Sequence, residues 1–269
     1  MLNRILMTGA AGGLGQAVRP ALSKLAHHVR LSDINDLGEA TAHEELIQCD
    51  VSDFDAVSDL VADCDGIIHL GGMSVEKPWQ KILHANIIGT YNIYEAVRQH
   101  GSKARVVYAS SNHAIGFYPR TQRIDTDVRH RPDSLYGVSK CFADDLASLY
   151  FDKFGIETLN VRIGSCFAEP TDARQLATWL SYRDFTSLLE RAFVVPKLGC
   201  TVIYGASNNR ESWWDNSKVA FLGWIPEDSS DPWREKIEQM PPEDPNDPAV
   251  VRHGGAFAAS GHPDDTQDE

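Results

Sequence analysis

The segment RILMTGAAGGLGQAV, residues 4–18, indicates the fold more strongly than any other part of the chain. It starts with a short apolar run, passes through a glycine loop and continues as a helical pattern. Gly9, Gly12 and Gly15 have the spacing G-x-x-G-x-x-G. Glycines let the backbone turn sharply after a strand and approach a pyrophosphate, which then lies at the helix N-terminus. The segment therefore predicts a dinucleotide site, and a tight turn without a ligand is the alternative.

An acidic residue follows this loop at the distance that such a site requires. HVRLSD (28–33) is predicted as the second strand, and Asp33 ends it about 20 residues after the loop. A carboxylate there accepts hydrogen bonds from the adenosine ribose and repels a ribose phosphate, which favours NAD over NADP. Arg30 lies just upstream and leaves that choice open unless its side chain points elsewhere.

Short apolar runs alternate with helical patterns as far as Ser165. Strands are predicted at 4–8, 28–33, 45–51, 66–72, 104–111 and 157–165, and helices at 14–26, 53–63, 78–101 and 134–155. Alternation of this kind requires crossover connections, which place helices on both faces of a parallel sheet. The expected fold class is therefore α/β, with a doubly wound parallel sheet.

The pattern loosens after Ser165, which suggests three parts of the chain. Residues 1–165 form the dinucleotide-binding core, and residues 166–240 form a small C-terminal substrate lobe. The lobe patterns are a helix at 172–193, a strand at 199–205, and a short helix with a turn at 214–226. Residues 241–269 are acidic and rich in Pro and Gly, so we expect a tail that is extended on the surface or partly disordered.

Composition excludes several classes of partner. Asp and Glu total 38 against 25 Lys and Arg, and the net charge of -13 argues against nucleic acid and anionic membranes. No apolar run approaches the ~20 residues of a membrane span, and the N-terminus lacks the apolar length of a signal peptide. The five cysteines contain no C-x-x-C pair, which is typical of free thiols in a reducing compartment. We therefore expect a cytoplasmic protein.

The segment LYGVSKCFADDLA places Tyr136 one helical turn before Lys140. A free phenol has a pKa of about 10 and is a poor base at neutral pH. A lysine on the same helix face adds positive charge to that of an oxidised nicotinamide, and both favour the phenolate. Ser111, at the end of the predicted fifth strand, can hold the substrate oxygen. The three side chains suit removal of a hydride from an alcohol, without a metal.

With these residues in place, the chain resembles the extended short-chain dehydrogenase/reductases over residues 3–226. The motifs that carry the resemblance are TGAAGGLG, NIIGTYNIYEA, VVYASSNHAIG, YGVSK and DNSKVAFLGWIP. The resemblance implies a Rossmann-type fold with Ser111 polarising the substrate and Tyr136 as acid/base. It also implies that Lys140 binds the nicotinamide ribose and lowers the tyrosine pKa. Asn86 matches the family's helix asparagine, which supports the cofactor site and a water relay; a polar residue on a partly buried helix is the alternative.

Further cofactor contacts are expected at the ends of the other strands. Asp50 and Val51 follow the third strand beside the adenine, and Leu70, Gly71 and Gly72 end the fourth strand. As alternatives, Asp50 caps the following helix and the glycines merely form a turn. The full set of predicted NAD contacts is Gly9, Gly12, Gly13, Leu14, Gly15, Asp33, Asp50, Val51, Leu70, Gly71, Gly72, Asn86, Ser110, Tyr136, Lys140 and Ile163.

The substrate end looks like that of the uronate dehydrogenases within this superfamily. The segments concerned are HLGGMSVEKPW, ASSNHAIGFYP, VRIGSCFAEP and GASNNRESWWDNS. The resemblance implies oxidation of galacturonate or glucuronate at the anomeric carbon, with an aldarolactone as product. The candidate substrate contacts are Ser74, Ser111, Asn112, His113, Tyr136, Ser165, Arg174 and Phe257.

Each substrate residue also has a plainer interpretation. Arg174 would clamp the carboxylate in bidentate fashion, or it is a surface arginine on a helix. His113 would bind ring hydroxyls together with Asn112, or it is a packed loop histidine. Ser74 and Ser165 would bind sugar hydroxyls or cap loops, and Phe257 closes the pocket only if the tail is ordered.

Three other functions compete with uronate oxidation. A nucleotide-sugar epimerase or dehydratase has the same catalytic residues, but this chain is short and its cations after Ser165 are scattered. An NAD-sensing regulator without enzyme activity commonly lacks the tyrosine or the lysine, and both are present here. A neutral hexose dehydrogenase is the third. Apolar positions on the helices at 78–101 and 134–155 exceed what one sheet face needs, so we expect at least a homodimer.

Overall fold

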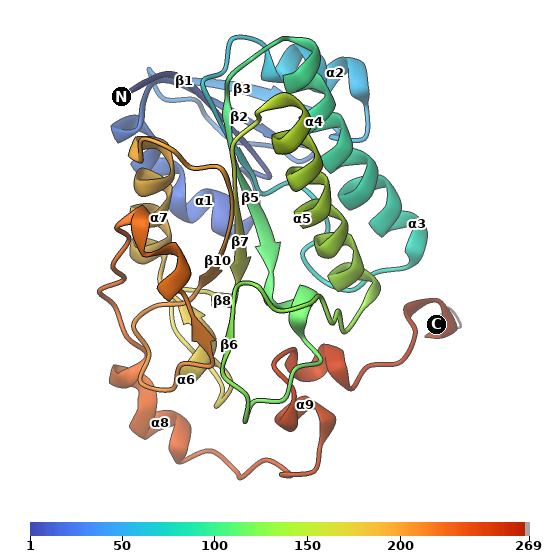
Figure 1. Ribbon diagram of the computed structural model, residues 1–269, viewed down its shortest axis with the longest axis vertical. Helices are drawn as coiled ribbons and strands as arrows, with labels where there is room; N and C mark the ends of the chain where they lie inside the picture. Colours follow the sequence, from blue (N-terminus) through green and yellow to red (C-terminus); the bar gives the residue numbers. More distant parts are fainter. Residues whose placement is uncertain (267–269) are drawn as a thin grey trace.

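The computed structural model describes residues 1–266, and a parallel sheet lies at its centre (Figure 1). Within these residues the sheet has seven strands in the order β10-β7-β5-β4-β1-β2-β3. The strands are β1 (Leu2–Thr8), β2 (Ala26–Asp33), β3 (Glu44–Gln48), β4 (Gly66–His69), β5 (Arg105–Ser111), β7 (Thr158–Ile163) and β10 (Cys200–Gly205). From β1 the chain runs outward to β3 and then returns to the other side of β1 with β4. Ligands bind at such a reversal, outside the carboxyl ends of the strands.

Helices cover both faces of the sheet, which confirms the predicted doubly wound α/β fold (Figure 1). The helices α2 (Phe54–Val61), α4 (Gly89–Gln99) and α5 (Leu135–Phe154) pack on one face, and α1 (Gly13–Val18) and α7 (Tyr182–Val194) on the other. Successive strand residues alternate between the two cores: Ile5 and Met7 belong to one, Leu6 to the other. No helix within residues 1–266 has the length and apolar character needed to cross a membrane.

Several predicted elements have different bounds in the structure. The helix expected at 14–26 is α1 followed by a 3-10 turn over residues 19–24, and the strand expected at 66–72 ends at His69. The helix expected at 78–101 consists of α3 (Trp79–Ile82), a π-helical turn (Leu83–Ile88) and α4. The helix expected at 172–193 is divided into α6 (Gln175–Thr178) and α7, because β9 (Trp179–Leu180) pairs with β8 (Ser165–Cys166) between them. The third strand ends at Gln48, so Asp50 and Val51 lie in the loop after it.

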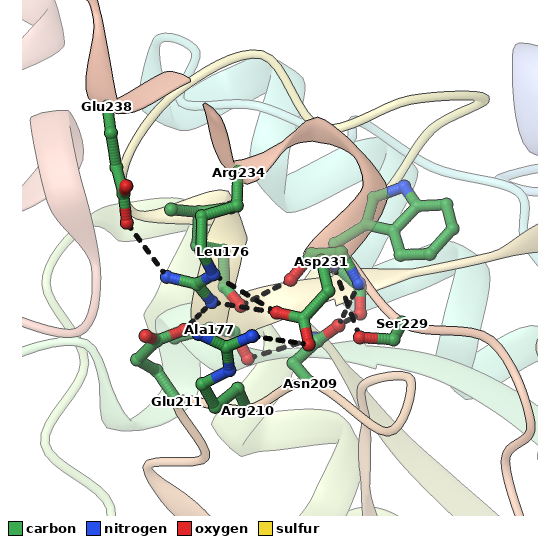
Figure 2. A network of polar contacts seen from close by, with 11 residues as sticks. Leu176, Ala177, Asn209, Arg210, Glu211, Ser229, Asp231, Arg234 and Glu238 are labelled. Carbon is green, nitrogen blue, oxygen red and sulfur yellow. Dashed lines mark hydrogen bonds and ion pairs between the residues drawn. The ribbon is translucent and has the colours of Figure 1, made fainter. Parts of the chain in front are cut away.

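The lobe after Ser165 is continuous with the sheet, since β10 is the outer strand beside β7. The short helix predicted at 214–226 is instead β11 (Trp214–Asp215), paired with β6 (Ile124–Asp125), followed by a 3-10 turn over residues 217–222. Arg234, on α8 (Arg234–Glu238), is mostly buried and bonds to Asp231, Glu211 and Glu238 (Figure 2). This network fastens α8 to the loop that carries Asn209 (Figure 2).

The tail, predicted to be extended on the surface or partly disordered, is exposed and without helix or strand over residues 241–246, but the part that follows is folded and partly buried. This segment forms α9 (Pro248–Val251) and 3-10 turns over residues 255–258 and 263–266, and returns along the lower end of the sheet (Figure 1). Arg120 holds it by donating to the carbonyl oxygens of Ala249 and Arg252, at 2.7 and 3.1 Å. His253 is fully buried and stacks on Trp213. Residues 267–269 of the predicted tail lie outside the described part.

Candidate active site

A cleft of about 840 Å³ opens over the carboxyl ends of the strands, where the strand order reverses. Of the residues predicted to bind cofactor or substrate, all line this cleft except Asn86 and Asn112. The fold therefore brings predicted site residues into one cleft although they lie up to 248 positions apart in the sequence, from Gly9 to Phe257 (257 − 9). Within residues 1–266, no group of three or more His, Cys, Asp and Glu side chains is arranged to hold a metal ion.

The glycine loop can accept a pyrophosphate. Gly9 has φ of +71°, and a Cβ on it would lie 2.7 Å from the backbone of Leu70 and Gly71, so the loop packs directly on the end of β4. A Cβ on Gly15 would lie 2.4 Å from the Gly9 carbonyl oxygen. Gly13, at the start of α1, has no described atom within 4 Å of that position and faces open space. The loop thus leaves the helix N-terminus free for a phosphate group.

The adenosine end of the cleft favours NAD. Asp33 lines the cleft, and its carboxylate accepts hydrogen bonds from the backbone amides of Ala11 and Asn35, both at 3.0 Å. Arg30, which left the cofactor choice open, is buried away from the cleft and pairs with Glu45 at 2.8 Å. Its guanidinium is therefore not available to a ribose phosphate.

The nicotinamide end offers an unpartnered donor. Ser110, at the end of β5, lines the cleft and is buried, and its hydroxyl has no hydrogen-bond partner among the described residues. A buried hydroxyl without a partner is costly, so a ligand that bonds to it stabilises the site. Together with the open loop and Asp33, Ser110 makes this cleft fit a dinucleotide.

Replacing Asp33 with asparagine should shift the cofactor preference toward NADP. The amide keeps the size and can still accept from Ala11, but it no longer repels a phosphate and bonds the ribose more weakly. We expect kcat/KM for NAD to fall about 10-fold and the NADP-to-NAD ratio to rise about 10-fold or more. Steady-state kinetics with both cofactors measures this ratio, and an unchanged ratio would contradict the assigned role. Asp36→Asn, in the following exposed loop outside the cleft, is the matched control.

The helix α5 presents the predicted catalytic pair, Tyr136 and Lys140, to the cleft. Ser134 caps it by accepting from the amide of Gly137 at 2.9 Å, and Tyr136 and Lys140 lie on its buried face one turn apart. The Lys140 ammonium donates to the carbonyl oxygen of Ala109 at 2.7 Å. It also lies 5.3 Å from the centre of the Tyr136 ring. Ser111 is near enough to Tyr136 to bond to its hydroxyl group.

Burial perturbs both members of this pair. Burial raises the pKa of Tyr136 to about 12, although the hydrogen bond from Ser111 lowers it. Burial lowers the pKa of Lys140 to about 7, and the nearby Asp144 opposes that shift. In the unliganded protein, therefore, the neighbouring cation does not bring the tyrosine below its ordinary pKa of 10.0. The predicted lowering of the Tyr136 pKa therefore requires additional positive charge near the phenol.

Replacing Lys140 with methionine should raise the melting temperature while lowering activity. Between about pH 7 and the ordinary lysine value of 10.5, the unfolded chain holds a proton that the native chain has lost. The free energy of unfolding therefore rises with pH across this window. The full destabilisation by the buried Lys140 charge is present only below about pH 7. We expect the variant's gain in Tm to be largest near about pH 6 and to shrink toward about pH 9.5.

Thermal unfolding of parent and variant across that pH range measures the difference. Lys81→Met is the matched control, because Lys81 lines the same cleft but is exposed, so its replacement should give no such pH-dependent gain. A gain in Tm that grew with pH would contradict the assignment. We also expect kcat/KM to fall about 100-fold at neutral pH, because the cation that favours the phenolate is lost.

Arg174 provides the positive charge at the substrate end. Its Nε donates to the carbonyl oxygen of His253 at 2.8 Å, and its Nη1 donates to Ser165 Oγ at 3.1 Å. With the Asn112 amide oriented to suit its neighbours, Nη2 donates to Asn112 Oδ1 at 2.7 Å. A guanidinium has five N–H donors, so one remains on each terminal nitrogen. Within residues 1–266 no carboxylate lies within ion-pair distance of Arg174, which is unusual for a half-buried cation.

His113 and Phe257 form an aromatic wall of the cleft. The two rings stack with centroids 4.0 Å apart, and both meet the Tyr136 ring edge-on, at 5.6 and 6.1 Å. Phe257 belongs to the C-terminal segment, residues 241–266, so that segment lines the cleft beside Tyr136. Ser74 lies exposed on the loop after β4 and lines the same end.

Asn86 and Asn112 lie behind the cleft wall. Asn86 bonds to both backbone groups of Met73, at 2.7 and 3.1 Å, and to Ser139 Oγ at 2.9 Å. Asn112 donates to the carbonyl oxygen of Ile163 at 3.0 Å and supports Arg174. Both amides therefore have protein partners, and each holds a neighbouring segment. Neither lines the cleft, although both residues are predicted ligand contacts.

Two acidic residues at this site are not apparent from the sequence alone. Glu76 accepts hydrogen bonds from the amides of Leu135 and Tyr136, at 2.9 and 2.7 Å, and so ties the loop after β4 to the start of α5. Asp133 accepts from the His113 ring at 2.8 Å. Asp133 directly precedes the helix cap Ser134, which is a weak signal, and Glu76 carries no signal beyond its closeness to Ser74.

Comparison with known proteins identifies relatives along the whole chain. Residues 5–185 match the family described as NAD dependent epimerase/dehydratase. A uronate dehydrogenase from Agrobacterium fabrum (strain C58) is 55% identical over 95% of this chain and 97% of its own length. A crystal structure of a glucuronic acid dehydrogenase from Chromohalobacter salexigens is 69% identical, with a TM-score of 0.97, and covers 99% of this chain and 100% of that one. A second crystal structure is of a tyrosine-to-alanine variant of Agrobacterium tumefaciens uronate dehydrogenase complexed with NAD. That protein is 54% identical, with a TM-score of 0.94, and the match covers 96% of this chain and 98% of that one.

Proposed function

We propose that this chain, which belongs to the NAD dependent epimerase/dehydratase family and within it to the uronate dehydrogenases, and which is therefore an NAD-dependent oxidoreductase, oxidises a uronic acid. The finer proposal is oxidation of D-galacturonate or D-glucuronate at the anomeric carbon, with an aldarolactone as product. Tyr136 is the general base, Ser111 polarises the reacting oxygen, Lys140 supports the phenolate and Arg174 holds the carboxylate.

One observation carries this proposal: Arg174 faces the cleft without a carboxylate partner in the described chain. Other buried arginines are paired, as Arg162 is with Asp144 at 3.1 Å. Burial lowers the pKa of Arg174 to about 10, which still leaves it a cation at neutral pH. Such a group binds an anion, and its two free N–H donors match the two oxygens of a carboxylate. A uronate supplies this carboxylate on the same small molecule as the alcohol to be oxidised.

The proposed steps use Ser111, Tyr136 and Lys140, which line the same cleft. When NAD is bound, its nicotinamide supplies the acceptor for the anomeric hydride. Ser111 donates a hydrogen bond to the anomeric oxygen, and Tyr136, as phenolate, removes the hydroxyl proton from that oxygen. The C–H electron pair leaves with the hydride, and the O–H electron pair forms the second bond between the anomeric carbon and its oxygen. The ring stays closed, so the product is the lactone. Lys140 keeps positive charge beside the phenolate during proton transfer.

A screen for NADH formation tests the proposal. The purified protein should reduce NAD with galacturonate or glucuronate and should leave NAD unreduced with UDP-sugars. NMR of the quenched product should identify a lactone before it opens. NADH formation with neutral hexoses but not with uronates would overturn the substrate assignment.

The epimerase alternative is disfavoured by the substrate end of the cleft. A nucleotide sugar needs cations for a second pyrophosphate, and the cations that line the cleft within residues 1–266 are Lys81, Lys140 and Arg174, besides the histidines. The aromatic wall of His113 and Phe257 also narrows this end. Turnover of a UDP-sugar without net NADH would support the alternative.

We propose further that the protein forms at least a homodimer in the cytoplasm. Large apolar side chains are exposed on α4 and α5, namely Tyr91, Val138, Leu149 and Phe154, and covering them by a second copy would remove this surface from water. All five cysteines are free, which suits a reducing compartment. Light scattering after size-exclusion chromatography measures the mass in solution, and a monomer would contradict the dimer.

A further inference from the structure

Asp133 is a buried carboxylate behind the cleft wall. Its side chain has no exposed surface, and its Oδ2 lies 2.8 Å from Nδ1 of His113. Its Oδ1 accepts from the hydroxyl of Ser134 at 2.9 Å. Among residues 1–266 no lysine or arginine lies within ion-pair distance of it. Burying an ionised carboxylate without a cation is costly, so the histidine is the partner that the fold provides.

The surrounding chain is built to admit this carboxylate. A Cβ on Gly116 or on Gly254 would lie 1.7 Å from Asp133 Oδ2, so a side chain at either position is excluded while Asp133 stays in place. The amide of Gly254 donates to the carbonyl oxygen of Gly116 at 2.9 Å. Two segments that lie 138 positions apart (254 − 116) therefore close over one side chain. Gly254 also precedes Phe257 in the segment that walls the cleft.

The contact determines which nitrogen of His113 carries the proton. An ionised carboxylate only accepts hydrogen bonds, so Nδ1 of a neutral ring must be the donor. The proton on Nδ1 leaves Nε2 with a lone pair, and Nε2 has no hydrogen-bond partner among the described residues. The ring lines the cleft and is fixed on both sides, by stacking on Phe257 and by its edge contact with Tyr136.

We propose that Asp133 is a positioning residue that holds His113 as a hydrogen-bond acceptor for a hydroxyl group of the sugar ring. It acts through His113 and does not touch the substrate. This proposal rests on the proposed function, because it assigns the hydroxyl to the same sugar whose carboxylate binds Arg174. A ring free to take the other tautomer would present an N–H group instead, and the substrate hydroxyl would have to reverse its own hydrogen bond.

The tautomer can be measured without any substrate. Nitrogen NMR of the protein labelled in its 10 histidines, at a pH where the imidazoles are neutral, distinguishes a protonated Nδ1 from a protonated Nε2. The His113 signals are those missing from His113→Ala. We expect protonated Nδ1 in the parent protein, and protonated Nε2 would overturn the proposal. This result does not depend on which sugar the enzyme oxidises, so it can fail while the proposed function holds.

A double-mutant cycle tests the functional consequence. Asp133→Asn keeps the shape, but its amide can donate to Nδ1 and so permits the other tautomer. We expect kcat/KM for the uronate to fall about 10- to 100-fold with KM for NAD unchanged. In the His113→Ala background the same change should cost less than about 3-fold, because the partner through which Asp133 acts is gone.

The control is another buried carboxylate outside the cleft. Asp184 accepts from Ser207 Oγ at 2.6 Å and from the amide of Asp228 at 3.0 Å, in the small lobe. Asp184→Asn should lower Tm without changing the His113 nitrogen signals. If the losses in kcat/KM of Asp133→Asn and His113→Ala multiply in the double variant, Asp133 merely stabilises the fold and the proposal is overturned. If Asp133→Asn does not fold, the tautomer in the parent protein still decides.

Discussion

Phenylalanine at position 136 should abolish turnover while leaving the fold and NAD binding intact. The hydroxyl of Tyr136 is the only group that the substitution removes, and the ring contacts with His113, Phe257 and Lys140 remain available. A general base contributes about 10²- to 10⁴-fold to a rate, and this position also carries the hydrogen bond from Ser111. We expect kcat to fall at least about 10³-fold, with little change in the dissociation constant of NAD.

The measurement combines steady-state NADH formation with fluorescence titration of NAD. Tyr118→Phe is the matched control, because that buried tyrosine bonds to the carbonyl oxygen of Arg129 outside the cleft, and its loss should change stability and not kcat. A Tyr136→Phe protein that turned over at the parent rate would remove the basis of the enzyme assignment.

The pH profile of the parent enzyme gives a second view of the same group. Burial raises the pKa of Tyr136 to about 12 despite the opposing effect of Ser111, so very little phenolate exists in the unliganded protein at neutral pH. Substrate oxidation requires the deprotonated form, and kcat/KM should therefore rise with pH on the acid side of its profile. The positive nicotinamide and the Lys140 ammonium both act in the direction that lowers this pKa, so bound NAD should move the rise toward neutral pH.

Much of the fold is predictable because its signals are local. The glycine loop, the apolar strands and the helix that carries Tyr136 each occupy one continuous segment, and each is found within a few residues of the predicted bounds. The cleft follows from the order of these elements, since parallel strands bring their carboxyl ends to one edge of the sheet. The sequence alone therefore assigns residues as distant as Asp33 and Lys140 to one site, and both line the cleft.

The tail could not be predicted because its partners lie elsewhere in the chain. Its Pro- and Asp-rich composition is typical of disorder, yet Arg120 and Arg174 hold its carbonyl oxygens and Gly116 pairs with Gly254. The same reason applies to Asp133 and Glu76, whose hydrogen bonds to His113 and to the start of α5 depend on how loops meet. Asn86 and Asn112 are predicted as ligand contacts, but neither lines the cleft, because the amide of each bonds to neighbouring protein groups.

Replacing Arg174 with methionine should remove the preference for uronates over neutral sugars. Methionine is similar in length and apolar, so it leaves the space filled and deletes the charge. Losing one partner of a buried, hydrogen-bonded ion pair costs about 2–5 kcal/mol, which corresponds to about 30- to 4000-fold in kcat/KM for galacturonate or glucuronate. Activity on the matching neutral hexose, which offers no carboxylate, should be affected much less, and the ratio of the two kcat/KM values measures the carboxylate contribution.

The ratio matters because Arg174 also supports the C-terminal segment. Its Nε holds the carbonyl oxygen of His253, so the variant loosens the segment that carries Phe257 and lowers activity on every substrate. That general loss cancels in the ratio, whereas loss of the clamp does not. Arg174→Lys sharpens the comparison: an ammonium keeps the charge but cannot present two parallel donors while also bonding to Ser165 and Asn112, so it should recover only part of the preference. If the methionine variant retains the parent ratio, the carboxylate is bound elsewhere and the proposed orientation of the sugar is wrong.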